Sequence, residues 1–224
     1  MKPCLALLIK SSLIISSLSL SSAAKQFTIV NQDGRKLEGA VLEIVLKTST
    51  NNKQLDPAAS KESRSVPYII DQVNKQFVPE LIVVPAGAEV SFPNSDNIRH
   101  HVYSFSKVKP FELKLYSGQP KDPIQFPNHG VVVLGCNIHD SMVGHIYIAQ
   151  SKYVAASNDK GLLNIDLPEG EIKLISLWHS NYVGGAEKTL PLTKAQLTNN
   201  NTLILSTQPD KPRNTFQEMF KDNN

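Results

Sequence analysis

Short apolar runs alternate with polar turns along most of the chain. The runs are four to eight residues long, and Gly, Pro, Asn or Asp residues bound most of them. Examples are residues 40–47, 81–84, 130–135 and 171–178. Apolar runs of this length between turn residues predict β-strands of a sandwich, whereas no long segment has the 3.6-residue period of a helix. We therefore expect an all-β fold.

The clearest alternation lies in "FELKLY", residues 111–116. It predicts a strand that turns Phe111, Leu113 and Leu115 towards a core. The residues between and after them, Tyr116 included, would then face water.

The first 24 residues differ from the rest. Lys2 and Lys10 border an apolar, Ser-rich stretch that ends in small residues, which predicts a secretory signal cut after Ala24. The mature protein would then be periplasmic or otherwise exported, without a membrane span. The chain has 23 Lys and Arg against 20 Asp and Glu. Two of the Lys lie in the signal, so the mature net charge is +1, which offers no argument for a nucleic-acid partner.

Cysteine usage singles out one residue. Cys4 lies in the predicted signal, so Cys136 is the single cysteine of the mature chain. An exported compartment is oxidising, and a lone thiol there has no partner for an internal disulfide. Cys136 is therefore either a small buried apolar residue or a ligand.

Cys136, His139 and Met142 lie three residues apart in a loop between two predicted strands. Thiolate, imidazole and thioether form a soft ligand set that suits copper. A loop can direct all three at one point, which leaves a fourth position for a histidine from elsewhere. His100 and His101 begin a predicted strand upstream, and only one of them can face the metal because neighbouring side chains of a strand point to opposite faces.

The segments "NSDNIRHHVYSF" and "GCNIHDSMVGHIYI" resemble the two metal-binding segments of cupredoxins, the blue-copper family that includes amicyanin and plastocyanin. The wider stretch, about residues 70–150, is similar to plastocyanin-like bacterial periplasmic proteins labelled methylamine-utilisation proteins. The resemblance implies a Greek-key β-sandwich that holds one copper ion in a type 1 site.

The resemblance also implies the roles of individual residues. The ligands would be His100, Cys136, His139 and Met142. His101 stands where these proteins usually have a supporting Asn, so it is either a supporting residue or a rival ligand. Asp140 is either a solvated loop residue or a negative charge that favours Cu(II).

The function implied is single-electron transfer between Cu(I) and Cu(II), with a redox partner protein docking near His139. We expect no enzyme activity, because the chain has no phosphate-binding glycine motif, no His-Glu-x-x-His and no serine in a nucleophile elbow. Two alternatives stay open. One is a periplasmic module that binds or delivers copper without electron transfer. The other is a β-sandwich binding protein that uses no metal.

The flanks of the cupredoxin-like region form the last expectation. "DGRKLEGAVL" and "DKGLLNIDLPEGEIKL" resemble parts of the carboxypeptidase-regulatory, transthyretin-like β-sandwich. We therefore hypothesise one small sandwich, made by both flanks, into which the cupredoxin domain is inserted. The alternative is that the flanks extend the copper sandwich, and the absence of a shared sheet between 27–47 and 162–178 would contradict the insertion. The expected segments are a signal peptide (1–24), an N-terminal β segment and linker (25–65), the cupredoxin domain (66–150), a C-terminal β segment (151–208) and a tail (209–224).

Overall fold

The computed structural model describes residues 24–47, 67–120 and 122–209. The predicted signal peptide up to residue 23, residues 48–66 with the predicted linker, and residues 210–224 of the tail lie outside them. The all-β prediction is confirmed, since strands dominate and α1 (Lys194–Asn199) is the one helix in the described ranges. Among these residues, no helix is both long enough and apolar enough to cross a membrane.

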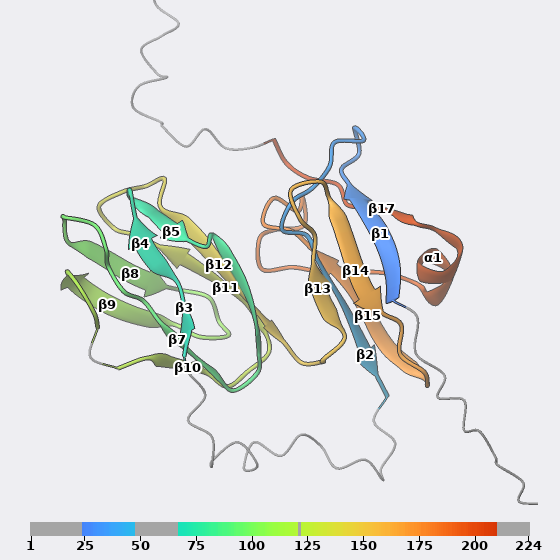
Figure 1. Cartoon of the computed structure of the whole chain (residues 1–224), viewed down its shortest axis with the longest axis horizontal. Coiled ribbons are helices and arrows are strands. Elements are labelled where there is room, and N and C mark those ends of the chain that lie inside the picture. Colours follow the sequence, from blue (N-terminus) through green and yellow to red (C-terminus); the bar gives the residue numbers. More distant parts are fainter. Residues whose placement is uncertain (1–23, 48–66, 121, 210–224) are drawn as a thin grey trace, which may run out of the picture.

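Two β-sheets and a hairpin, all within residues 68–149, pack around one hydrophobic core that includes Phe92, Val102, Leu134 and Ile146. We call this unit the central sandwich (Figure 1). Its larger sheet has the order β6 (Leu81–Pro85), β12 (Val143–Ala149), β11 (Gly130–Gly135), β8 (His100–Ser104) and β9 (Phe111–Tyr116). Its smaller sheet has the order β10 (Ile124–Phe126), β7 (Ala88–Ser91) and β3 (Tyr68–Ile69), and the hairpin joins β4 (Asp71–Val73) to β5 (Gln76–Val78).

The remaining strands form a second unit, the flanking sandwich, with its own core that includes Phe27, Ile44, Leu163 and Leu177. One sheet has the order β14 (Leu162–Asp166), β1 (Ala24–Val30) and β17 (Thr202–Ile204). The other has the order β13 (Val154–Ala156), β2 (Val41–Leu46), β15 (Ile172–Trp178) and β16 (Leu190–Pro191). Figure 1 shows the strands from both ends of the chain side by side in this unit.

The pairing of the flanks bears directly on the insertion hypothesis. β1 is antiparallel to β14, and β2 is antiparallel to β15. Residues 27–47 and 162–178 therefore share two sheets, and the arrangement that would have contradicted an insertion is not observed. The domain boundaries and the likeness of the flanks to transthyretin-like sandwiches stay predictions.

The alternation predicted for residues 111–116 is wrong at its end. Leu115 is 53 % exposed, whereas Tyr116 is half-buried against the core of the central sandwich. The register between β8 and β9 shifts by one residue between the pairs Val102–Leu113 and His100–Tyr116. A bulge of this kind reverses which side chains face the core, so the strand ends with its tyrosine inward.

The two sandwiches meet through a third cluster of buried residues, which includes Val41, Val131, Tyr147 and Trp178. At its edge lies Glu43, which is buried. The Tyr147 hydroxyl donates to the Glu43 carboxylate at 2.9 Å, and the backbone N–H groups of residues 150 and 151 donate at 2.8 Å. The contact between the sandwiches is therefore both apolar and hydrogen-bonded.

His145 lies at the same contact. Its ring packs against the Trp178 ring, with 5.5 Å between centroids, and its residue is only 5 % exposed. Burial, helped by the nearby His179 side chain, lowers the pKa of His145 to about 4. The ring is therefore neutral at pH 7.

This burial predicts a pH-dependent stability. Below about pH 6.5 the unfolded chain takes up a proton at His145, while the folded ring stays neutral until about pH 4. The contribution of the neutral, buried His145 ring to the free energy of unfolding is complete above pH 6.5 and is lost as the pH falls towards 4. The wild-type protein should lose unfolding free energy between pH 7 and pH 5. We expect this loss to be about 2 kcal/mol smaller in His145→Phe.

Urea unfolding followed by circular dichroism at both pH values measures this difference. His129→Phe, at an exposed position, is the matched control and should keep the wild-type pH dependence. An equal pH dependence in the wild type and His145→Phe would contradict the prediction.

Candidate metal centre

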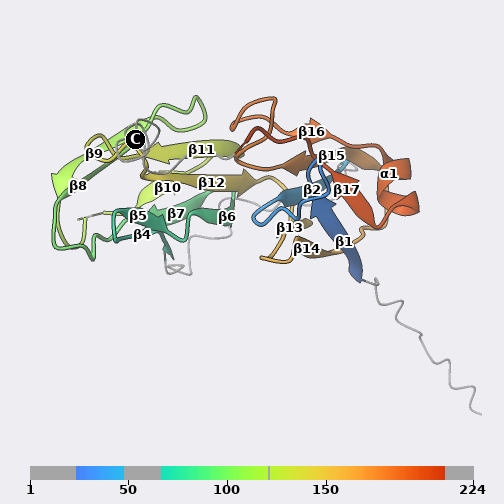
Figure 2. The ribbon, with the colours of Figure 1, turned by 90° about the horizontal axis from the view of Figure 1, so that it is seen from above.

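The loop between β11 and β12 carries the cysteine motif. β11 ends at Gly135, Cys136 follows directly, and β12 begins at Val143. The Met142 backbone N–H donates to the His139 carbonyl at 2.9 Å, which closes the turn between them. This loop lies at the end of the central sandwich that points away from the flanking sandwich (Figure 2).

Three side chains from two segments converge at this loop. The Cys136 Sγ lies 3.7 Å from the His100 Nδ1 and 3.7 Å from the His139 Nδ1. The ligand atoms of the three residues all lie within 4.8 Å of one another. Cys136 is 4 % exposed and His100 is fully buried, whereas His139 is half-buried. We call this group the His–Cys–His cluster.

The spacing within the His–Cys–His cluster fits one metal ion. In zinc sites with the same ligand atoms, metal–nitrogen and metal–sulfur bonds run at about 2.0 and 2.3 Å. One ion bonded to both atoms at tetrahedral to trigonal angles would hold them roughly 3.5–3.7 Å apart. Two imidazoles with a thiolate are also the equatorial set of blue-copper sites. The donor set and its spacing therefore suit copper.

The structure separates the two neighbouring histidines. The His100 ring points inward to Cys136, whereas His101 lies on the other face of β8. There the His101 Nε2 lies 2.9 Å from the Glu112 carboxylate, and its ring packs on Tyr103 at 5.5 Å between centroids. The strand alternation thus brings His100, and not His101, to the His–Cys–His cluster.

The two remaining predicted residues have different surroundings. Met142 is 1 % exposed and belongs to the same buried cluster as Cys136. Asp140 is exposed in the turn. Axial ligation by Met142 stays a prediction, as does the role of Asp140.

The structure adds residues that the sequence motifs did not identify. The Asp96 carboxylate lies 2.7 Å from the His100 Nε2, on the side of the ring away from Cys136. The Asn94 side chain donates to the carbonyls of Ile98 at 2.9 Å and Tyr116 at 2.8 Å. These contacts fix the segment that leads into β8. The sequence signal, an Asp four residues before His100, resembled an ordinary turn residue.

A second group of residues that the sequence motifs did not identify lies beneath this segment. The buried Gln72 amide donates to the Pro93 carbonyl at 2.9 Å and to the Tyr116 hydroxyl at 2.5 Å. The Tyr116 hydroxyl donates in turn to the Phe92 carbonyl at 2.6 Å. Burial raises the pKa of Tyr116 to about 12, so the hydroxyl stays a donor. The network ties the end of β9 to the segment before Asn94.

The charge states around the His–Cys–His cluster also suit a cation. Burial alone would raise the pKa of the Asp96 carboxyl, but the Lys75 backbone N–H, the His100 ring and the Asn74 backbone N–H together hold it below its ordinary value. Burial, followed by the charges of His100 and Lys75, lowers the pKa of His139. An ionised carboxylate behind His100 and a neutral His139 ring are the forms that a metal site needs.

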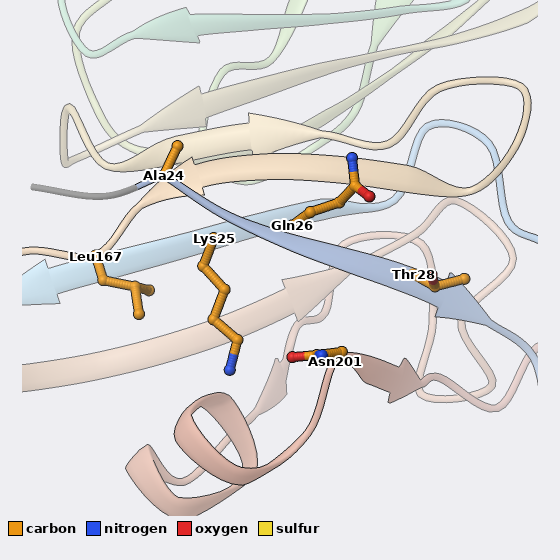
Figure 3. A pocket seen from close by; sticks show the side chains of 6 residues that line it. All are labelled: Ala24, Lys25, Gln26, Thr28, Leu167 and Asn201. Atoms are coloured by element: carbon orange, nitrogen blue, oxygen red, sulfur yellow. The ribbon is translucent and has the colours of Figure 1, made fainter.

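A separate open pocket lies on the flanking sandwich. Figure 3 shows its lining, which comprises Ala24, Lys25, Gln26, Thr28, Leu167 and Asn201. The Lys25 ammonium donates to the carbonyls of Leu197 and Thr198 at the end of α1, at 2.7 and 3.1 Å. The charged group of this pocket is thus already engaged, and the metal motif lies on the other sandwich.

Comparisons with known proteins find remote similarity to solved structures of copper proteins. No family model matches the chain, and no curated protein matches it. A copper-containing nitrite reductase from Thermus scotoductus is 25% identical with a TM-score of 0.36, and the match covers 38% of this chain and 23% of that chain. This chain therefore spans less than a quarter of the reductase.

Two smaller copper proteins are similar to the chain at the same level. An oxidised variant of amicyanin is 17% identical with a TM-score of 0.35, and the match covers 40% of this chain and 88% of that one. A purple cupredoxin from Nitrosopumilus maritimus is 21% identical with a TM-score of 0.32, over 36% of this chain and 96% of that one. These structures belong to the family that the two sequence segments resemble. Because these TM-scores lie below 0.5, we infer the metal site from the geometry of the His–Cys–His cluster.

The geometry predicts unequal effects of two adjacent substitutions. His100→Ala should weaken copper binding by at least about 100-fold, more than the loss of a residue outside the ligand set usually costs. His101→Ala is the matched control and should change the affinity by less than about threefold, because its ring faces Glu112. Competition with a chromophoric copper chelator measures both affinities. Equal losses in the two variants would contradict the assignment of His100.

Proposed function

We propose that this protein is an exported copper protein that carries single electrons between redox partners through one type 1 site. The ligands are His100, Cys136, His139 and Met142. The observation that carries the proposal is the convergence of both Nδ1 atoms on the Cys136 sulfur at 3.7 Å. Copper held there would supply one-electron chemistry between Cu(I) and Cu(II).

The protein's own contribution is to keep the ligands still. His100 and Cys136 are buried among the core residues of the central sandwich, so their side chains have little room to move. Asn94 ties the segment before His100 to the end of β9, and the Met142 N–H closes the loop that bears His139. Ligands held in this way need little rearrangement when the charge of the site changes, which favours fast electron transfer.

A module that binds or delivers copper is the main rival function. Delivery requires ligands that let the metal go, and an exposed, flexible set would suit it. Two of the three clustered ligands here are at most 4 % exposed. This burial favours a resident ion over a transferred one.

An absorption spectrum separates these functions. We expect the purified full-length protein to bind one Cu(II) with an intense visible thiolate-to-copper band and a reversible one-electron couple. Cys136→Ser should lose the band, because the thiolate is its source. Stoichiometric Cu(II) binding without a band or couple would favour the delivery function, and no copper binding would favour a metal-free binding protein.

Electron exchange with a partner requires an approach to the copper ligands. His139 is the half-buried member of the His–Cys–His cluster. Its neighbour Ile138 is 50 % exposed, and Val143 is 41 % exposed. We propose that a redox partner docks on this small apolar surface, formed by Ile138, His139 and Val143.

A charge on this surface should hinder docking. Ile138→Lys should slow electron self-exchange between the Cu(I) and Cu(II) forms of the protein by about tenfold, equivalent to about 1.4 kcal/mol lost from the encounter. NMR line broadening in mixtures of the two forms measures the rate. Ile204→Lys, at a 60 % exposed position on β17, is the matched control. An equal slowing in both variants would contradict docking near His139.

A further inference from the structure

The buried ring of His100 is held at both nitrogens. Its Nδ1 faces the Cys136 sulfur at 3.7 Å, and its Nε2 lies 2.7 Å from the Asp96 carboxylate. If Nδ1 is the metal ligand, Nε2 carries the hydrogen and donates it to Asp96. Such a carboxylate–histidine pair orients the ring and makes it a stronger electron donor.

Asp96 is held by a turn from a distant part of the chain. The Asn74 backbone N–H donates to one carboxylate oxygen at 2.6 Å, and the Lys75 N–H donates to the other at 2.9 Å. These two residues join β4 to β5, and we call them the Asn74–Lys75 turn. Each carboxylate oxygen of Asp96 thus receives a backbone hydrogen bond, which leaves the side chain little freedom to leave His100.

The Asn74–Lys75 turn has an uncommon backbone conformation. Asn74 has φ of 53° and Lys75 has φ of 59°, values that non-glycine residues seldom adopt. Positive φ at both central residues matches the hairpin turn that a two-residue connection favours, and it directs two successive N–H groups to one side. Both residues are exposed, so the contact to Asp96 depends on their backbone and not on their side chains.

The hairpin is also fastened beside Asp96. The Ser95 hydroxyl donates to the Asp71 carboxylate at 2.7 Å, and Asp71 begins β4. The Asp96 N–H donates to the Asn94 side chain at 3.1 Å. The hairpin and the segment before His100 therefore form one hydrogen-bonded unit.

We propose that Asp96, held by the Asn74–Lys75 turn, is a positioning residue that orients His100 and lowers the reduction potential of the copper site. This inference rests on the proposed function. The carboxylate increases electron donation from the His100 ring, and Cu(II), which carries the higher charge, gains more from it than Cu(I). A hairpin outside the ligand set thereby tunes the site.

Three variants of the full-length protein test this role. Asp96→Asn removes the charge with little change in shape. It should weaken Cu(II) binding relative to Cu(I) binding about 10–100-fold. Each factor of ten corresponds to a rise of about 59 mV in the reduction potential. Asn74→Val disfavours positive φ and should raise the potential in the same direction. Asn74→Gly favours positive φ and is the matched control, with a potential like that of the wild type. Substitution at Asn74 leaves the charge of Lys75 in place.

Spectroelectrochemistry measures each potential, and circular dichroism verifies that each variant is folded. In the double variant, Asn74→Val should add little to Asp96→Asn, because both act through one carboxylate. An unchanged potential in Asp96→Asn, or full additivity in the double variant, overturns the inference. A wild-type protein without an intense visible band or a reversible couple contradicts the proposed function instead, whatever the variants do.

Discussion

The His–Cys–His cluster depends on β8 and β11 being neighbours in one sheet. His139 and Met142 come with Cys136 in a single loop, but His100 is 36 residues away from Cys136. The pairing of Gly135 with Tyr103 brings the end of β11 beside β8. A slip of one residue in this register would turn His101 inward in place of His100.

A glycine supports that register. A Cβ atom on Gly135 would lie 2.8 Å from the Tyr103 ring, so the aromatic ring occupies the space that a side chain would need. The bulge between β8 and β9 has a related effect on the other side of β8. It turns Tyr116 inward, opposite His100, where its hydroxyl reaches the Phe92 carbonyl and its own carbonyl receives the Asn94 amide. The bulge between β8 and β9, which made the alternation predicted for residues 111–116 wrong at its end, therefore also helps to hold the His–Cys–His cluster.

Much of the fold and part of the site followed from the sequence because they depend on local patterns. Short apolar runs predicted the strands. Strand alternation predicted that only one of His100 and His101 faces the site. The contacts around Asp96 and Gln72 could not be predicted, because they join segments that only the fold brings together. The Asn74–Lys75 turn is such a case: no glycine marks it, and its role depends on Asp96, some twenty residues further along the chain.

The pairing of the two chain ends has a consequence for the order of assembly. Every strand pair of the central sandwich lies within residues 68–149, so this unit can close as soon as that stretch has left the ribosome. Within the described ranges, by contrast, the strand partners of β1 and β2 are β13, β14, β15 and β17. During synthesis, β1 and β2 therefore have unpaired edges until their partners follow, because the central sandwich lies between them and these partners along the chain. Unpaired edges invite pairing with other chains, so slow synthesis would expose the flanking sandwich, rather than the central sandwich, to aggregation.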